Sequence, residues 1–192
     1  GAVMAGGPLA GIRVMDMTSV VVGPMVTLML ADYGADVVKV EPPTGDIVRN
    51  LAGRAITPNM SPKFLHLNRN KRSLAIDLKK PAAYEALTKL LAQADVLLWN
   101  VRPSAMARLK LSYDHVKAIN PKIIYCGIVG FGQNGRYRNK PAYDSIIQGS
   151  GGIAALHHRA TGEPRYVPIV MADKTTGLIA TQMVLMALYH RE

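Results

Sequence analysis

Two strand-like segments separated by a short helix near the start of the chain constrain the fold more than any other feature. Ile12–Met17 and Asp36–Glu41 are rich in β-branched and other apolar residues, as strands are. Gly23 and Pro24 open a helix between them, because proline is tolerated in a first turn, and Gly34 suits a helix end. Two strands joined by one helix form a βαβ unit, so the sequence predicts a parallel sheet with a right-handed crossover.

The same alternation continues through most of the chain. Further strands are expected at Phe64–Leu67, Ser73–Ile76, Asp95–Trp99 and Lys122–Val129. Helices are expected from Pro81 to Leu91, around Met106, from Tyr113 to Ile119 and from Tyr143 to Gln148. Loops are expected at Thr44–Pro62 and Gly130–Pro141. This pattern predicts an α/β fold, a Rossmann-like parallel sheet flanked by helices. Residues 1–7 are expected to be a tag remnant or frayed tail, and residues 8–192 a single α/β domain.

A binding site is expected beyond the carboxyl ends of the strands, where open α/β sheets bind their ligands. The residues at those predicted ends are Ser19, Val20, Val21, Glu41, Asn100, Arg102 and Gly130.

The chain is basic, and this charge favours an anionic partner. The net charge is +10, from 23 Lys and Arg against 13 Asp and Glu. Nucleic acid, a phosphorylated cofactor and an acidic membrane surface would all fit. Aromatic residues are only 6% of the chain, too few for the stacking platforms that single-stranded nucleic acid needs. We expect no nucleic acid as a partner, and the +10 charge keeps a basic nucleic-acid-binding module as an alternative.

The compartment and the relation to membranes follow from two local features. The one cysteine, Cys126, cannot form an intramolecular disulfide, which fits a reducing compartment, and we expect a cytoplasmic protein. The longest early apolar stretch, Val14–Leu30, contains Asp16, Gly23 and Pro24, so no membrane span is expected.

One carboxylate, Asp173, follows the apolar run Val167–Ala172 and precedes a helix-compatible segment. An Asp at that position is typical of an N-cap, whose oxygens accept hydrogen bonds from the first-turn N–H groups. The alternative is a nucleophilic carboxylate displayed at an element boundary. The spacing alone favours the cap.

Three other motifs have a functional and a structural interpretation. Gly130–Gly135 matches GxGxxG, but the residues after it are a poor helix start, so a glycine-rich loop is favoured and no NAD is expected. Asn68–Arg72 is either a solvated hairpin or a clamp for phosphates. His157 and His158 have no second ligand pair at metal spacing, so we expect an exposed loop and no metal.

Tyr143-Asp144 and Arg136–Arg138 are candidate pocket residues.

Several segments, in order, resemble the class III CoA-transferases. They are Pro8–Val14, Gly23-Pro24, Leu30–Glu41, Asn70–Leu78, Asp95-Val96, Tyr143-Asp144 and Ala172-Asp173. The family includes formyl-CoA transferase, carnitine CoA-transferase and α-methylacyl-CoA racemase. Each segment alone is weak, but the ordered set is specific, and it runs from Pro8 to the end of the chain.

The resemblance implies an architecture and a ligand. Family members are roughly twice as long as this chain and form interlocked homodimers with a large and a small domain. The chain is therefore similar to the N-terminal half of a family member, and to the N-terminal portion of its large domain. Coenzyme A or acyl-CoA would be bound as substrate, with no metal and no NAD. The implied binding residues are Ser19, Val20, Val21, Lys71, Arg72, Ile76, Asn100, Val101, Arg108, Lys140 and Tyr143.

The resemblance also implies a reaction. Asp173 matches the family's nucleophile and would carry CoA from an acyl-CoA donor to a small carboxylic acid through an aspartyl anhydride and an aspartyl-CoA thioester. Formyl-CoA transferase has other residues where this chain has Ser19, Val21 and Pro42, so formate and oxalate are not implied. An acyl-CoA racemase is the alternative, although that branch has a catalytic His where this chain has Tyr143. The fragment alone is expected to be inactive.

Overall fold

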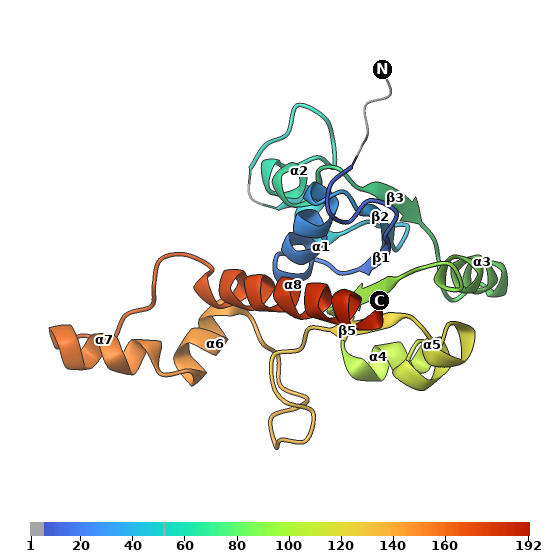
Figure 1. Cartoon of the computed structure of the whole chain (residues 1–192). Coiled ribbons are helices and arrows are strands. Elements are labelled where there is room, and N and C mark those ends of the chain that lie inside the picture. Colours follow the sequence, from blue (N-terminus) through green and yellow to red (C-terminus); the bar gives the residue numbers. More distant parts are fainter. Residues whose placement is uncertain (1–5, 52) are drawn as a thin grey trace.

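Parallel strands form one sheet at the centre of the molecule (Figure 1). The computed structural model describes residues 6–51 and 53–192. The strands are β1 (Arg13–Met17), β2 (Asp36–Glu41), β3 (Arg72–Ala75), β4 (Val96–Trp99) and β5 (Ile124–Gly127). Their order is β3-β2-β1-β4-β5, and all neighbours are parallel. The sequence therefore correctly predicts the α/β class and the parallel sheet. The strand order reverses at β1, and ligands bind at such switch points.

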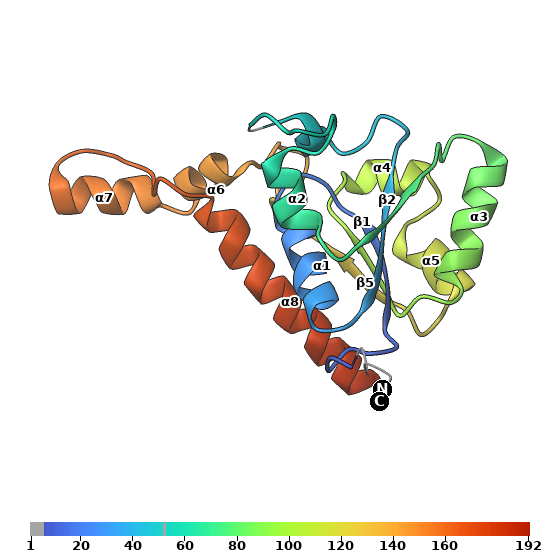
Figure 2. The ribbon, with the colours of Figure 1, turned by 90° about the horizontal axis from the view of Figure 1, so that it is seen from above.

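Helices cover both faces of the sheet. They are α1 (Val22–Asp32), η1 (Ile47–Asn50), α2 (Pro62–Asn68), α3 (Pro81–Leu91), α4 (Pro103–Arg108), α5 (Tyr113–Ile119), α6 (Asp144–Ser150), α7 (Ile153–Thr161) and α8 (Met171–Arg191). Figure 2 shows α1, α2 and α8 on one side of the sheet and α3, α4 and α5 on the other. In both ribbon views α6 and α7 extend away from the sheet.

Each face of the sheet has its own hydrophobic core, because successive strand residues point to opposite faces. In β4, Val96 and Leu98 pack with α1 and α8, whereas Leu97 and Trp99 pack with α3, α4 and α5. All of β4 is buried. Near-continuous apolar strands are what a parallel sheet covered on both faces requires.

The segment before the sheet is tied to the end of α1. Gly34 has a positive φ of 103° and follows the last turn of α1, as predicted. Gly7 lies so close to this turn that a Cβ on it would come within 2.1 Å of the Tyr33 carbonyl oxygen. Residues 1–5, which the sequence assigns to a tail, lie outside the described residues.

The predicted strand at Phe64–Leu67 is wrong, because these residues lie in α2. Ser61 accepts a hydrogen bond from the Phe64 N–H (3.1 Å), and Pro62 occupies the first helical position. A Ser-Pro pair is a helix-start signal that outweighs the strand-like composition of these residues. β3 also pairs in parallel with β2, so the hairpin expected at Asn68–Arg72 does not form.

Two other expectations need correction. His157 and His158 lie in the helix α7 and not in a loop, between Gly152 and Gly162, both of which have a positive φ. The loop expected at Thr44–Pro62 contains the short helix η1, which begins where the Asp46 side chain accepts a hydrogen bond from the Val48 N–H. None of the helices in residues 6–51 and 53–192 combines the length and the hydropathy needed to cross a bilayer.

Candidate active site

A cleft of about 340 Å³ lies at the carboxyl ends of β1, β4 and β5. Its walls are the segments that follow these strands, the loop before α6 and the first turns of α8. The predicted site residues that line it are Ser19, Val20, Val21, Asn100, Val101, Lys140, Tyr143 and Asp173. Segments far apart in sequence thus meet at the switch point of the sheet.

Four predicted binding residues lie elsewhere. Lys71 is buried and bonded to protein groups beneath the loop that follows β1, and Arg72 pairs with Asp36 on the surface. Ile76 packs against the core on the α3 side of the sheet, and Arg108 is exposed at the end of α4. None of these four side chains lines the cleft.

The loop between β1 and α1 is held in one conformation by side chains from other elements. Asn100 accepts a hydrogen bond from the Ser19 N–H (2.9 Å) and donates one to the Ser19 carbonyl oxygen (2.7 Å). Val20 has a φ of 67°, a left-handed conformation that costs about 1–3 kcal/mol, and its N–H donates to Asp46 (3.3 Å). This loop delivers the start of α1, whose first N–H groups have no intrahelical partner, to the cleft.

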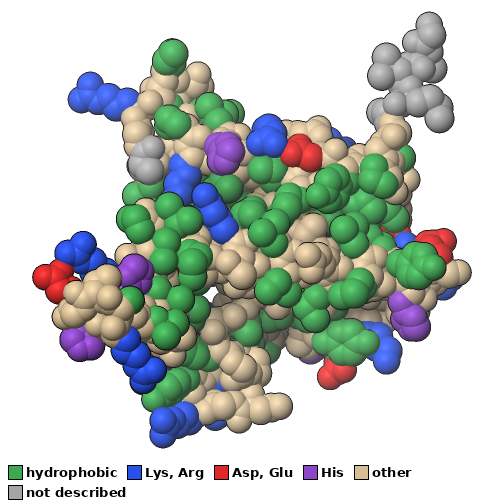
Figure 3. Space-filling model, turned by 60° about the vertical axis from the view of Figure 1, so that its left-hand side comes forward, with side chains coloured by type: hydrophobic (Ala, Val, Ile, Leu, Met, Phe, Trp, Pro, Cys, Tyr) green, Lys and Arg blue, Asp and Glu red, His purple; other side chains and the backbone are tan. Residues whose placement is uncertain are grey.

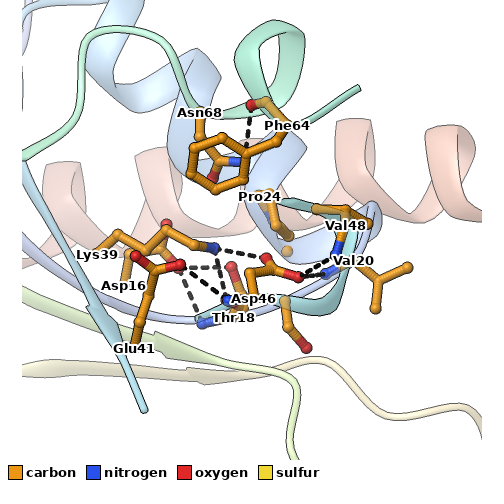
Figure 4. A network of polar contacts seen from close by, with 12 residues as sticks. Asp16, Thr18, Val20, Pro24, Lys39, Glu41, Asp46, Val48, Phe64 and Asn68 are labelled. Carbon is orange, nitrogen blue, oxygen red and sulfur yellow. Dashed lines mark hydrogen bonds and ion pairs between the residues drawn. The ribbon is translucent and has the colours of Figure 1, made fainter. Parts of the chain in front are cut away.

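Beneath the loop lies a buried network of charged side chains (Figure 4). Lys39 contacts Asp46 and the Thr18 carbonyl oxygen, both at 2.9 Å. Lys71 contacts Asp16 at 3.1 Å and donates to Asn68 at 2.9 Å. The network accounts for the burial of these charges, because each one has an opposite charge beside it.

The network shifts the pKa values of its members. Burial raises the pKa of Asp16, but Lys71, Lys39 and two threonine hydroxyls outweigh it and the pKa is lowered. Burial lowers the pKa of Lys71 to about 8, against the opposing effect of Asp16. The Lys71 ammonium thus lies against Asp16 beneath the loop and does not line the cleft.

A second ion pair fixes the segment that carries Asp46. Arg49 contacts Glu41 through two nitrogens, at 2.9 and 2.7 Å, and its guanidinium lies 3.8 Å from the centre of the Phe64 ring. Burial opposes ionisation of Glu41, but hydrogen bonds from Arg49, Ser73 and the Asp46 N–H lower its pKa to about 2. The pair holds η1 and α2 against β2.

Asp173 is the third residue of α8, and its side chain is half-buried. The N-cap is Val170, with no side-chain cap, so the prediction that Asp173 caps the helix is wrong. Its own backbone N–H instead donates to the carboxylate of Asp144 (2.9 Å). Across the described residues, no hydrogen bond reaches the Asp173 carboxylate, which borders the cleft.

Burial raises the pKa of Asp173, and the negative charge of Asp144 raises it further, while Lys63 opposes both. A carboxylate with a raised pKa is more basic and a better nucleophile than an ordinary one. The cations on the cleft wall, Arg102, Arg138 and Lys140, would bind an anionic group there.

Sequence reasoning missed several of these residues. Gln148 is buried and joins α6 to the segment before α8, and nothing in its local sequence signals that role. Arg138 and Asp144 were candidates without a mechanism, and neither Lys63 nor Thr176 was singled out. Thr176 follows Asp173 by one helical turn and lines the cleft, a neighbour that the helical period predicts.

The glycine-rich segment Gly130–Gly135 is not followed by a helix at the position that a dinucleotide fingerprint requires. Residues 130–143, all of them described, form turns, bends and irregular backbone, and the next helix begins at Asp144. This segment therefore lacks the helix start that dinucleotide binding needs. Within the described ranges, no three His, Cys, Asp or Glu side chains come together where they could hold a metal ion.

The sequence model of CoA-transferase family III matches residues 9–192. The chain belongs to this family. It is 38% identical over 189 residues to a succinate–glutarate CoA-transferase of Agrobacterium fabrum, covering 95% of this chain and 47% of that protein. It is 41% identical over 184 residues to a formyl-CoA:oxalate CoA-transferase of Streptomyces avermitilis, and the match covers 96% of this chain and 44% of that protein.

Solved structures agree with this assignment. A CAIB/BAIF family protein from Brucella suis matches with a TM-score of 0.90 and 37% identity, over 97% of this chain and 50% of that one. The chain thus spans about half the length of the family III relatives it matches.

Proposed function

We propose that the complete family III protein transfers coenzyme A from an acyl-CoA donor to a small carboxylic acid, with Asp173 as the nucleophile. The observation that carries this proposal is the half-buried Asp173 carboxylate, which borders a cationic cleft and accepts no hydrogen bond from the described residues. The CoA-transferase names of the relatives support the same reaction class.

The chemistry proceeds by exchange of acyl groups on this carboxylate. Asp173 attacks the thioester carbonyl carbon, and the carbon–sulfur bond breaks to release CoA thiolate and leave a mixed anhydride. The thiolate attacks the aspartyl carbonyl, which expels the donor carboxylate and gives an aspartyl-CoA thioester. An acceptor carboxylate then repeats both steps in reverse order and leaves as the new acyl-CoA. A raised pKa supports the first attack, because a more basic carboxylate is more nucleophilic.

The residues that would hold CoA are those of the cleft. The start of α1 and the cations Arg102, Arg138 and Lys140 would bind its phosphates. Ser19, Val20, Val21, Asn100, Val101 and Tyr143 would form the rest of the wall. Lys71, Arg72, Ile76 and Arg108 stay predictions that the cleft does not support, because none of them lines it.

The assembly and compartment are part of the proposal. The family resemblance supports an interlocked homodimer of the complete protein, and the single cysteine supports a reducing, cytoplasmic location. Acyl-CoA and a small carboxylic acid are the proposed small-molecule partners.

An acyl-CoA racemase is the second candidate, because the racemase branch shares the scaffold and the matched Asp173, although Tyr143 stands on the cleft wall where that branch has a catalytic His. Racemisation needs a base on each side of the α-carbon. The discriminating measurement is deuterium uptake at Cα of a branched acyl-CoA in heavy water. Uptake at a rate comparable to turnover would favour the racemase, and its absence would remove it.

Replacement of Asp173 in the complete enzyme tests the transferase. Asp173→Asn keeps the size of the side chain but removes the nucleophile, so transfer between succinyl-CoA and glutarate, and between other acid pairs, should fall by at least about 10³-fold. Binding of CoA, measured by calorimetry, should stay within a few-fold of wild type. Transfer retained by the variant would refute the role of Asp173.

A further inference from the structure

The first turn of α8 carries Asp173 but is not anchored in either hydrophobic core. The buried residues of this helix begin at Gly177, and none of the positions from Met171 to Thr176 is buried. α6, its neighbour at this end, itself extends away from the sheet (Figures 1 and 2). Polar contacts must therefore set the position of the helix start.

Gln148 supplies most of those contacts. It is only 3% exposed, and its side-chain oxygen accepts from the Val167 N–H (2.9 Å). Its amide nitrogen donates to the carbonyl oxygens of Val167 (3.3 Å) and Ile169 (3.1 Å). One buried side chain thus fixes the backbone of the segment that enters α8.

Asp144 connects this anchor to the reactive residue. One of its oxygens accepts from the Gln148 amide (2.6 Å), and the other accepts from the Asp173 backbone N–H (2.9 Å). It therefore acts as an N-terminal cap supplied by a different helix, and Gln148 holds the capping carboxylate in place.

The same arrangement places a negative charge behind the Asp173 carboxylate. The charges that act on Asp173 are those of Asp144 on α6 and Lys63 on α2, and the other titratable side chains of the cleft wall are Arg102, Arg138, Lys140 and Tyr143. Repulsion from Asp144 disfavours a side-chain orientation toward α6 and favours one toward the cleft.

We propose that Gln148 and Asp144 are positioning residues that fix the backbone of Asp173 and direct its carboxylate into the cleft. This inference rests on the proposed transferase function. Neither Gln148 nor Asp144 lines the cleft, so each acts through Asp173 and not on substrate.

Gln148→Met in the complete enzyme removes the hydrogen bonds and nearly preserves the volume. A displacement of the nucleophile by about 1 Å can cost on the order of 100-fold in rate, so kcat should fall about 10- to 100-fold. The dissociation constant of CoA and the KM of the acyl-CoA should stay within about threefold, because the cleft wall is unchanged.

Asn120→Leu is the matched control. Asn120 also uses a side-chain amide to join backbone segments, because it donates to the carbonyl oxygens of Leu91 (3.0 Å) and Ala94 (2.8 Å). These carbonyls precede β4, so the contact lies at the amino ends of the strands, whereas the cleft lies at their carboxyl ends. Loss of the Asn120 contact should lower the melting temperature and leave kcat per folded molecule unchanged. If Gln148→Met behaves in the same way, Gln148 has a structural role only and the proposal is refuted.

Asp144→Asn gives a readout that does not depend on turnover. The variant removes the like charge, so the pKa of Asp173 should fall toward its ordinary value. Carbodiimide-driven amidation of the tryptic peptide Tyr166–Lys174, followed by mass spectrometry against pH, reports this pKa. The apparent midpoint and the acidic limb of kcat/KM should both move to lower pH. An unchanged midpoint would refute the placement of Asp144 behind Asp173.

The failures of the two proposals can be told apart. Absence of transfer in wild type with every donor would refute the proposed function, yet the amidation midpoint would still show whether Asp144 positions Asp173. Transfer in wild type with an unaltered kcat in Gln148→Met would refute only the positioning proposal.

Discussion

Asp16 is the residue on which the base of the cleft depends most directly. Its two oxygens accept hydrogen bonds from Thr18 and Thr27, and it pairs with Lys71, all without exposure to solvent. Thr18 in turn offers its carbonyl oxygen to Lys39. Loss of the Asp16 carboxylate would therefore remove hydrogen bonds that hold Thr18 and the loop that follows β1.

We predict that Asp16→Asn lowers the free energy of unfolding by about 3–5 kcal/mol, because it leaves buried lysine charge without its partner. Urea denaturation measures this loss. The control is Asp36→Asn, which breaks the exposed pair with Arg72 and should cost at most about 1 kcal/mol. Equal losses in the two variants would contradict the structural role assigned to Asp16.

At the scale of elements, the cleft depends on how closely α8 packs against α1. Gly177 lies at this contact, where an added Cβ would lie 3.3 Å from the Met25 sulfur and 3.6 Å from the Val22 carbonyl oxygen. Val22 begins α1 and lines the cleft. A larger side chain at Gly177 would therefore move both helices that border the site.

Gly177→Leu should cost about 1–3 kcal/mol of stability through overpacking, and it should weaken CoA binding as the start of α1 shifts. Thermal unfolding and calorimetry with CoA measure the two effects. Ala86→Leu, at an exposed position on α3 on the other side of the sheet, is the control and should change neither. Tight CoA binding in Gly177→Leu would show that the α1–α8 contact does not set the cleft.

The elements also show what the sequence can and cannot predict. β1, β2, β4 and β5 were predicted within a few residues, because strands of a parallel sheet covered on both faces form apolar runs that local sequence reveals, most clearly in the fully buried β4. α2 was missed because Phe64 and Leu67 look strand-like until Ser61 and Pro62 are read as a helix start.

The candidate site was predictable only in part. Residues at strand ends, such as Ser19 and Asn100, could be placed in one cleft because the carboxyl ends of parallel strands all lie at the same end of the sheet. The Asp144–Asp173 hydrogen bond could not, because it joins residues 29 positions apart and depends on how α6 docks on α8. The burial of Lys71 was likewise invisible, since its partner Asp16 lies 55 positions away.

At the scale of the whole molecule, α8 presents an apolar side that the described residues do not cover. Ile179, Met183 and Met186 are each more than half exposed, and Tyr189 is 85% exposed. Figure 3 shows hydrophobic side chains spread over the face that is turned forward from the left of Figure 1. Together with a length about half that of the family III relatives, this favours a site completed by further protein surface.

We therefore predict that these 192 residues alone give little or no CoA transfer, whereas the complete protein is active. Both proteins would be assayed with the same acyl-CoA and acid pairs at equal concentration of folded protein. Light scattering on the complete protein should show a dimer. Turnover by the 192-residue chain equal to that of the complete protein would contradict this account.

The most direct test of the central claim is mass spectrometry of the complete protein after mixing with a panel of acyl-CoA thioesters, with hydroxylamine added to trap activated carboxyl groups. The account predicts a CoA adduct, or its hydroxamate, on the tryptic peptide Tyr166–Lys174 that contains Asp173. Bound CoA with no adduct from any donor would contradict covalent catalysis by Asp173.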